Sequence, residues 1–180
     1  MGVISSNWCM IGAIAAGICS FVGTFVNFVN ICVLLKGKLK NTIRPNFKTL
    51  APLVFCQSVA DLCFCLFGLP IVAVRYVYKE DVFEIFSENL CQHFVLFFYA
   101  GGGLSSFIKC LISVNRLYVT KNPDDHEKVE NVFSWSRCFM YCSLIWIVCL
   151  GFLSLPYAGV WGEITQNNHT YSCTIKKRGE

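Results

Sequence analysis

Residues 58–70 of the chain read Ser-Val-Ala-Asp-Leu-Cys-Phe-Cys-Leu-Phe-Gly-Leu-Pro, and they place one carboxylate, Asp61, near the middle of an apolar block. The block runs from about Phe47 to Tyr76, longer than the roughly 20 residues that a helix needs to cross a bilayer. A charge at the centre of a membrane helix costs roughly 2.5–3.5 kcal/mol on insertion scales. Asp61 is therefore expected to face the interior of a helix bundle.

The whole chain shares this apolar character. Of its 180 residues, 55% are hydrophobic and 14% are charged, whereas soluble domains carry roughly 25% charged residues. Because lipid offers no partners for open backbone groups, each long apolar block is expected to form a helix. We predict an all-α membrane protein in which one domain, residues 1–180, holds four transmembrane helices and then an outer loop, at about residues 11–35, 47–76, 90–119, 133–155 and 157–180.

The charged residues between the blocks predict the orientation. The connection after the first block carries cations and no acid, and the positive-inside rule therefore places it in the cytoplasm. The next connection, residues 78–89, is mainly acidic. The amino terminus and residues 157–180 are then expected outside the plasma membrane. The cations behind the net charge of +4 lie next to the apolar blocks, where they determine the orientation in the membrane. The expected partner is therefore the lipid bilayer and not nucleic acid. The cations of the first connection are Lys36, Lys38, Lys40, Arg44 and Lys48.

A second charge, Lys109, lies inside the third block. Its ammonium is expected to lean outward along the helix, toward the depth of Asp61, where the two side chains are able to form an ion pair. There are two alternatives for Lys109: its side chain lines a water-filled cleft, or it extends along the helix so that its ammonium reaches the cytoplasmic face of the membrane. For Asp61 the alternatives are an ion- or proton-linked site and a neutral carboxyl satisfied by nearby hydroxyls or amides.

Two features predict modification on the outer side. Most of the twelve cysteines lie inside apolar blocks as small buried side chains, but Cys91 and Cys173 face an oxidising compartment and can form a disulfide. Such a bond closes a long loop, which is worth on the order of 4 kcal/mol in the chain-entropy model; two free thiols are the alternative. Asn168-His169-Thr170 is an acceptor sequence for a glycan, used or unused.

The sequence predicts no enzyme and no cofactor. Its histidines, His93, His126 and His169, are scattered over both predicted faces of the membrane. Sequence patterns of zinc proteases, serine hydrolases and phosphate-binding loops are not found in the chain.

Several positions resemble those of rhodopsin-like (class A) G-protein-coupled receptors. Asn27 resembles the asparagine of the first helix in that family, and residues 58–62 with Pro70 look like its second helix. The third block opens with Cys91 and closes with residues 113–118, similar to the family's Asp-Arg-Tyr end. The fourth block has Trp146 and, ten residues later, Pro156, as in the family. The outer loop after it, in residues 160–162 and 171–175, looks like that of moody-type and melatonin-receptor-like orphan receptors.

The resemblance implies a fold and a set of roles. The four blocks would be helices one to four of a seven-helix bundle, with Asn27, Trp146 and Pro156 in helix packing. Asp61 with Ser105 would form a sodium and activation site. Arg116, between Asn115 and Leu117, would be the activation switch that meets a heterotrimeric G protein, an extracellular ligand would bind from outside, and Cys91 with Cys173 would form the outer-loop disulfide.

Departures from the family pattern change these expectations. Asn115 replaces the acid before Arg116, so the local ion pair that restrains this arginine is absent and higher basal activity is expected. Lys109 replaces an apolar residue and is expected to compete with sodium for Asp61. Phe98 replaces the aspartate that binds amines, which makes a biogenic amine a poor candidate ligand.

The chain ends soon after Cys173, where helices five to seven of the family would follow. It is therefore expected to be a truncated or incomplete receptor that cannot signal alone, and that can associate with a full-length receptor. A four-helix membrane scaffold of the tetraspanin-like or junctional kind is the alternative function. A channel or transporter comes third, supported only by Asp61 and Lys109.

Overall fold

The computed structural model describes residues 6–44, 47–78, 88–123, 125–160, 162–167 and 172–176. The described part of the chain is a helical bundle followed by one short hairpin, which confirms the predicted fold class. The elements are α1 (Ser6–Leu39), α2 (Ala51–Cys63), the π-helical turn η2 (Phe64–Gly68), α3 (Leu69–Tyr78), α5 (Glu88–Lys121), α6 (His126–Val132), α7 (Trp135–Tyr157), β1 (Glu163–Asn167) and β2 (Ser172–Lys176).

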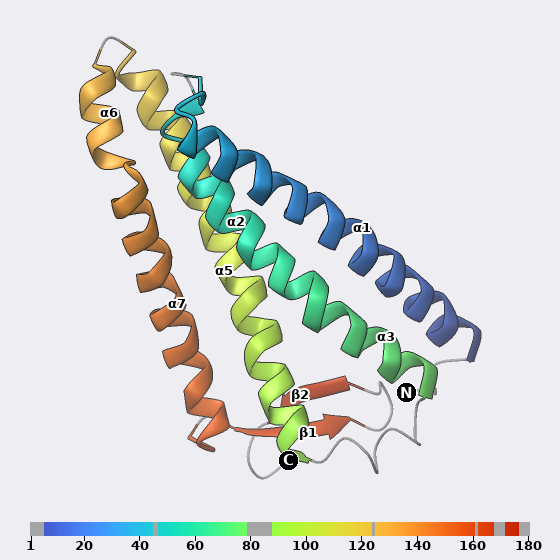
Figure 1. The fold of residues 1–180 in the computed structure, drawn as a ribbon. Coiled ribbons are helices and arrows are strands. Elements are labelled where there is room, and N and C mark those ends of the chain that lie inside the picture. The colour runs from blue at the N-terminus through green and yellow to red at the C-terminus, as the bar shows by residue number, and fades with distance from the viewer. Residues whose placement is uncertain are drawn as a thin grey trace.

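Four long helical rods lie side by side, because α2, η2 and α3 form one continuous helix (Figure 1). The α2 rod occupies the centre: it contacts α1, α5 and α7, while α5 also contacts α7. Three described helices are long and apolar enough to span a membrane by themselves, at Asn7–Leu39, Ala51–Val77 and Trp135–Pro156. The fourth rod, α5, has 34 residues, a length of about 51 Å at 1.5 Å per residue.

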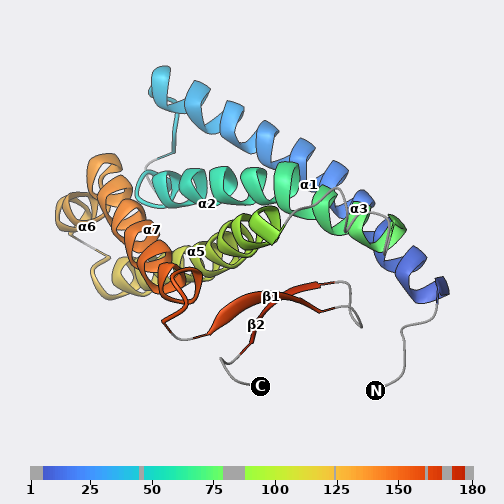
Figure 2. The same cartoon turned by 90° about the horizontal axis from the view of Figure 1, so that it is seen from below.

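The two ends of the bundle differ. One end, called the loop end below, holds the turn after α1 and the short helix α6 (Figure 1). The other, called the hairpin end, carries β1 and β2, which pair antiparallel with Thr165 opposite Thr174. Both strands contact α5, and Figure 2 shows them next to it in the view from below. The sequence predicted an outer loop here without predicting these strands.

The surface of the rods is strongly apolar. Only 6% of the apolar window of α1 is buried, and large side chains such as Phe21 and Ile147 are 78% and 67% exposed. Water would penalise so much exposed apolar area, whereas the hydrocarbon of a bilayer does not. The surface of the described rods is therefore suited to contact with the hydrocarbon chains of lipids.

Small residues and cysteines fill the interface between the rods. Cys56 and Ala60 of α2 pack with Leu104 and Ile108 of α5 and with Cys142 of α7. A second cluster toward the loop end joins Leu53 to Val129, Phe133 and Cys138. Small side chains allow neighbouring helix backbones to approach closely, and this is the usual basis of packing in membranes.

The π turn lies where α1 meets the second rod. Within η2, Leu69 donates its backbone N–H to the carbonyl of Phe64 instead of that of Cys65, and Pro70 has no N–H to offer. The carbonyl of Cys65 is thus left for a donor from another helix. The hydroxyl of Ser20 on α1 donates to it at 2.7 Å.

Candidate functional site

A cluster of three polar side chains lies between α2 and α5 in the middle of the bundle. The Ser105 hydroxyl donates to Asp61 Oδ1 at 3.1 Å, and the Gln57 amide donates from Nε2 to Asp61 Oδ2 at 2.8 Å and to Ser105 Oγ at 2.6 Å. The structure therefore brings together Asp61 and Ser105, which were paired in the sequence analysis only by resemblance. The third member, Gln57, was missed. It lies one helical turn before Asp61, a spacing that puts both side chains on one face.

Gln57 determines what this cluster can bind. Its amide group donates from Nε2 to Asp61 Oδ2 and to Ser105 Oγ, two oxygens that a cation would use as ligands, while Asp61 Oδ1 accepts from Ser105. A sodium ion requires oxygen ligands, and hydrogen-bond donors directed at the same oxygens exclude it. In this arrangement the residues do not fit a sodium ion. The Oε1 atom of Gln57 is itself buried and has no hydrogen-bond partner among the described residues.

Lys109 does not join this cluster. Its side chain is exposed, and within the described ranges no ion pair connects it with Asp61. The physical reason is visible in the packing: Ile108, which is fully buried, takes the inward position on that turn of α5, and Asp61 already accepts hydrogen bonds from Gln57 and Ser105. The expected ion pair between Lys109 and Asp61 is therefore absent from this structure.

The predicted switch residues lie at the loop end of α5. Asn115 is only 2% exposed, and its Nδ2 has no hydrogen-bond partner among the described residues. Arg116 and Leu117 are both exposed. Asn115 thus occupies a buried position without restraining Arg116 electrostatically, and no ion pair to Arg116 occurs within the described part of the chain.

The predicted packing residues make local contacts. Asn27 donates from Nδ2 to the carbonyl of Gly23 at 2.9 Å, Trp146 packs against the cluster around Cys56, and Pro156 is buried in the last turn of α7. Phe98 turns its ring toward η2, with its centroid 5.0 Å from that of Phe64.

The two cysteines of the predicted disulfide belong to elements that meet at the hairpin end. Cys91 lies in the first turns of α5 and Cys173 in β2, opposite Gln166, and α5 contacts β2. The structure thus brings the two elements together, while the two cysteine side chains lie outside its description. Asn168 also lies outside the described residues.

Comparison with known proteins identifies the family. The model of the family described as 7 transmembrane receptor (rhodopsin family) matches residues 53–179. "Protein trapped in endoderm-1" of Drosophila melanogaster is 29% identical over 169 residues, which make up 94% of this chain and 40% of that protein. "Galanin receptor 2a" of Danio rerio is 27% identical over 175 residues, covering 93% of this chain and 44% of that protein. The chain spans less than half the length of these curated relatives.

The match covers more than half of the chain and includes Asp61, Ser105 and Arg116. It favours a receptor over a membrane scaffold or a channel, and the family consists of multi-pass plasma-membrane receptors that are not enzymes. The apolar helices of the bundle agree with this placement. The chain belongs to the rhodopsin family of seven-transmembrane receptors.

Proposed function

We propose that this chain supplies the first four helices of a G-protein-coupled receptor that transmits an extracellular signal. The observation that carries the proposal is the placement of Arg116, which is exposed at the end of α5 opposite the hairpin, next to a buried Asn115. In this proposal a ligand binds near the hairpin end and a heterotrimeric G protein meets Arg116 at the loop end.

Asn115 has a further consequence for the switch. An aspartate at this position would carry a negative charge beside Arg116 and favour the resting position of its guanidinium, whereas the neutral amide provides no such attraction. We therefore expect basal activity above that of relatives with an acid here. The exposed face of α5, which includes Lys109, would be covered by further helices of a complete receptor or of a full-length receptor that associates with this chain.

Nucleotide exchange on heterotrimeric G proteins tests the proposal. The chain is joined to helices five to seven of a receptor of the same family, expressed in cell membranes and assayed against a panel of G proteins. Exchange is expected without added ligand, and Arg116→Ala should lower it about tenfold, within the usual range of coupling between sites. Arg137→Ala is the matched control, because Arg137 is also exposed at the loop end but hydrogen-bonds to the carbonyl of Asn131. Exchange at background level with every G protein would refute the proposal.

The orientation is part of the proposal and has its own test. With the amino terminus and the hairpin outside the plasma membrane, Asn168 faces the compartment in which glycans are added. Asn168→Gln should then increase gel mobility by the mass of one glycan in protein made by a eukaryotic cell. Asn167→Gln is the control, since Asn167 does not begin an acceptor sequence. Mobility that is the same for both variants and the parent would contradict the use of this site.

The ligand is proposed to be other than a biogenic amine. Phe98 offers an aromatic ring, packed on Phe64, where an amine would need a carboxylate. The outer loop further supports a place near moody-type and melatonin-receptor-like receptors. Dopamine, serotonin and octopamine are expected to leave the exchange rate unchanged, and a response to any of them would exclude this part of the proposal.

A further inference from the structure

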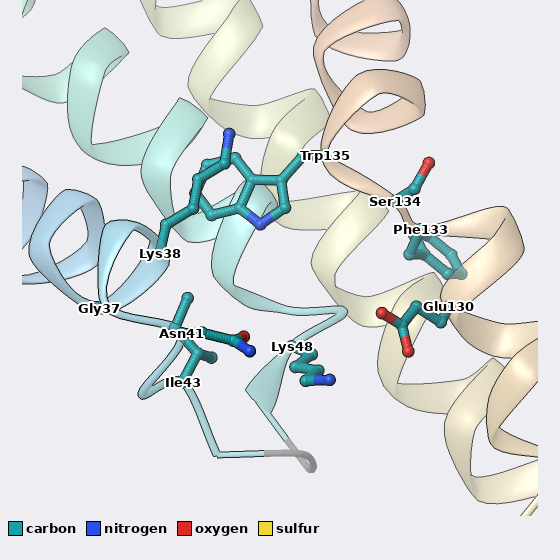
Figure 3. Close-up of a pocket in the computed structure, with 9 residues that line it drawn as sticks. All are labelled: Gly37, Lys38, Asn41, Ile43, Lys48, Glu130, Phe133, Ser134 and Trp135. Atoms are coloured by element: carbon teal, nitrogen blue, oxygen red, sulfur yellow. The ribbon is translucent and has the colours of Figure 1, made fainter.

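Two hollows flank the turn that follows α1 at the loop end. The smaller has a volume of about 230 Å³ and is drawn in Figure 3, with Lys38, Lys48, Glu130 and Trp135 among its lining residues. The larger has a volume of about 720 Å³ and shares Gly37 and Ile43 with the smaller in its lining. We call it the basic groove, and it is lined chiefly by Lys36, Lys40, Thr42, Ile43, Arg44 and Phe47.

The basic groove is formed by a well-defined helix end. Asn41 has a positive φ of 51°, its N–H donates to the carbonyl of Lys38 at 3.2 Å, and the N–H of Thr42 donates to that of Gly37 at 3.0 Å. These two bonds are those of a Schellman cap with Asn41 in the left-handed position. Gly37 leaves room for this turn, because a Cβ there would lie 3.1 Å from Cγ1 of Ile43, whose side chain would have to shift by a few tenths of an ångström. Arg44 is thus brought back toward the last turn of α1.

The charge in the basic groove is uncompensated. Lys36, Lys40 and Arg44 line it together with no acid, and none of the three forms an ion pair within the described ranges. The smaller hollow differs in this respect, because it contains Glu130. Its Lys38 also has a partner: the ammonium lies over the ring of Trp135, 4.2 Å from the centroid (Figure 3). An anion would therefore bind in the basic groove and not in the hollow beside it.

The position of the groove along α1 indicates which anion this is. From Ser6 to Leu35 the helix carries no charged residue, and Lys36 is the first. At 34 residues, or about 51 Å, α1 is longer than the roughly 30 Å hydrocarbon layer, so its last turn reaches the level of the lipid headgroups. Ile43 and Phe47 form apolar walls beside the cations, next to Val33, which is 62% exposed.

We propose that the basic groove binds the phosphate of an anionic phospholipid. The phosphate lies among Lys36, Lys40 and Arg44, while an acyl chain follows the apolar wall along Phe47 and Val33. Clusters of cations directly beyond a membrane helix attract anionic headgroups, and here a closed turn holds such a cluster around a hollow. The proposal rests on the insertion of the helices in a bilayer but not on signalling, so a lipid-binding measurement tests it independently of any G protein.

The test is native mass spectrometry of the whole chain in detergent, titrated with dioleoyl phosphatidic acid, dioleoyl phosphatidylcholine or inorganic phosphate. Phosphatidic acid is expected to bind more tightly than either of the others. Each cation that is removed should weaken the affinity for phosphatidic acid about fivefold. Lys36→Gln is therefore expected to lower this affinity about fivefold, and Lys36→Gln combined with Arg44→Gln about 25-fold. Arg44→Lys keeps the charge and should retain binding.

Lys48→Gln is the matched control, because it removes the same charge from the same connection but in the smaller hollow. It should change binding by less than about twofold if the groove is the site. An equal loss with Lys48→Gln would show that only the overall charge of the connection matters, and would overturn the proposal. Equal binding of phosphatidylcholine would overturn it as well, and inorganic phosphate binding as tightly as the lipid would replace it with a free-phosphate site.

Discussion

The hydroxyl of Ser20 on α1 donates a hydrogen bond of 2.7 Å to the backbone carbonyl of Cys65 in η2. This bond connects two rods at the point where the second rod departs from α-helical geometry, since Leu69 bonds to Phe64 and Pro70 has no N–H. Neighbouring serine side chains are one of the means by which membrane helices satisfy backbone groups that a proline has freed.

Ser20→Ala is expected to destabilise the bundle by about 0.6–1.7 kcal/mol, which runs from the average to the largest contribution of a hydrogen bond between membrane helices. The loss arises because the carbonyl of Cys65 keeps its place in an apolar environment without a donor. Unfolding in increasing mole fractions of sodium dodecyl sulfate measures the effect. Ser106→Ala is the control, because its hydroxyl bonds to the carbonyl of Gly102 on the same helix and is exposed. Equal losses in the two variants would contradict a special role for Ser20.

Gly23→Ala should destabilise the bundle by more than Ser20→Ala, in the range of about 1–3 kcal/mol for overpacking. A Cβ at this position would overlap the sulfur of Cys65, so the Cys65 side chain would have to leave its rotamer or α1 and η2 would have to move apart. Gly17→Ala is the matched control, since a Cβ there meets nothing within 4 Å. Combining Gly23→Ala with Cys65→Ala removes the sulfur and should restore much of the stability; purely additive losses would show that the two positions do not contact each other.

Gln57→Leu is expected to make the stability of the chain depend on sodium. The substitution removes the N–H donors from Asp61 and Ser105 and leaves their oxygens free for a cation. At a sodium concentration about tenfold above its Kd, the melting temperature should rise by roughly 3 °C relative to choline chloride, whereas the parent chain should show no difference.

The control for this prediction is Gln57→Leu combined with Asp61→Asn, which lacks the charge that attracts sodium and should be insensitive to it. A parent chain that responds to sodium as strongly as Gln57→Leu would show that Gln57 does not block the site.

The predicted disulfide has a direct test. Peptide mapping under non-reducing conditions should recover Cys91 joined to Cys173, and reduction should lower the stability by on the order of 4 kcal/mol. Cys9→Ser serves as the control, because Cys9 is buried in α1 as a free thiol and its loss should leave the mapped bond in place. Recovery of Cys91 and Cys173 as separate alkylated peptides would exclude the bond.

The fold could be predicted from the sequence because a bilayer requires long apolar helices, and three of the four blocks are apolar enough to span it by composition. Asp61 could be identified for the same reason, since a carboxylate inside such a block is costly. The side chains that contact Asp61 could not be identified from the position of the carboxylate alone. Whether Gln57 or Lys109 reaches Asp61 depends on which side of each helix turns inward, and Ile108 takes the inward position beside Lys109.

Other features depend on single bonds that no pattern in the sequence reveals. Pro70 indicates a disturbed helix but not a π turn, which also requires the donor from Ser20. The strand Ser172–Lys176 alternates polar residues with Cys173 and Ile175, a signal that the sequence analysis missed, whereas Glu163–Asn167 has Ile164 as its single apolar residue and shows no such periodicity. The basic groove likewise exists only because the turn at Asn41 closes.

A π turn holds one more residue per hydrogen-bonded ring than an α turn, and the extra residue changes the register of everything beyond it. Side chains of α3, such as Arg75 and Tyr76, therefore point about 100° away from the directions that an uninterrupted α-helix from Ala51 would give them. A comparison with a relative whose second helix is regular must place a one-residue gap within Phe64–Gly68. Without that gap, the residues nearest the hairpin end would be compared with the wrong neighbours, although every residue before Phe64 would be matched correctly.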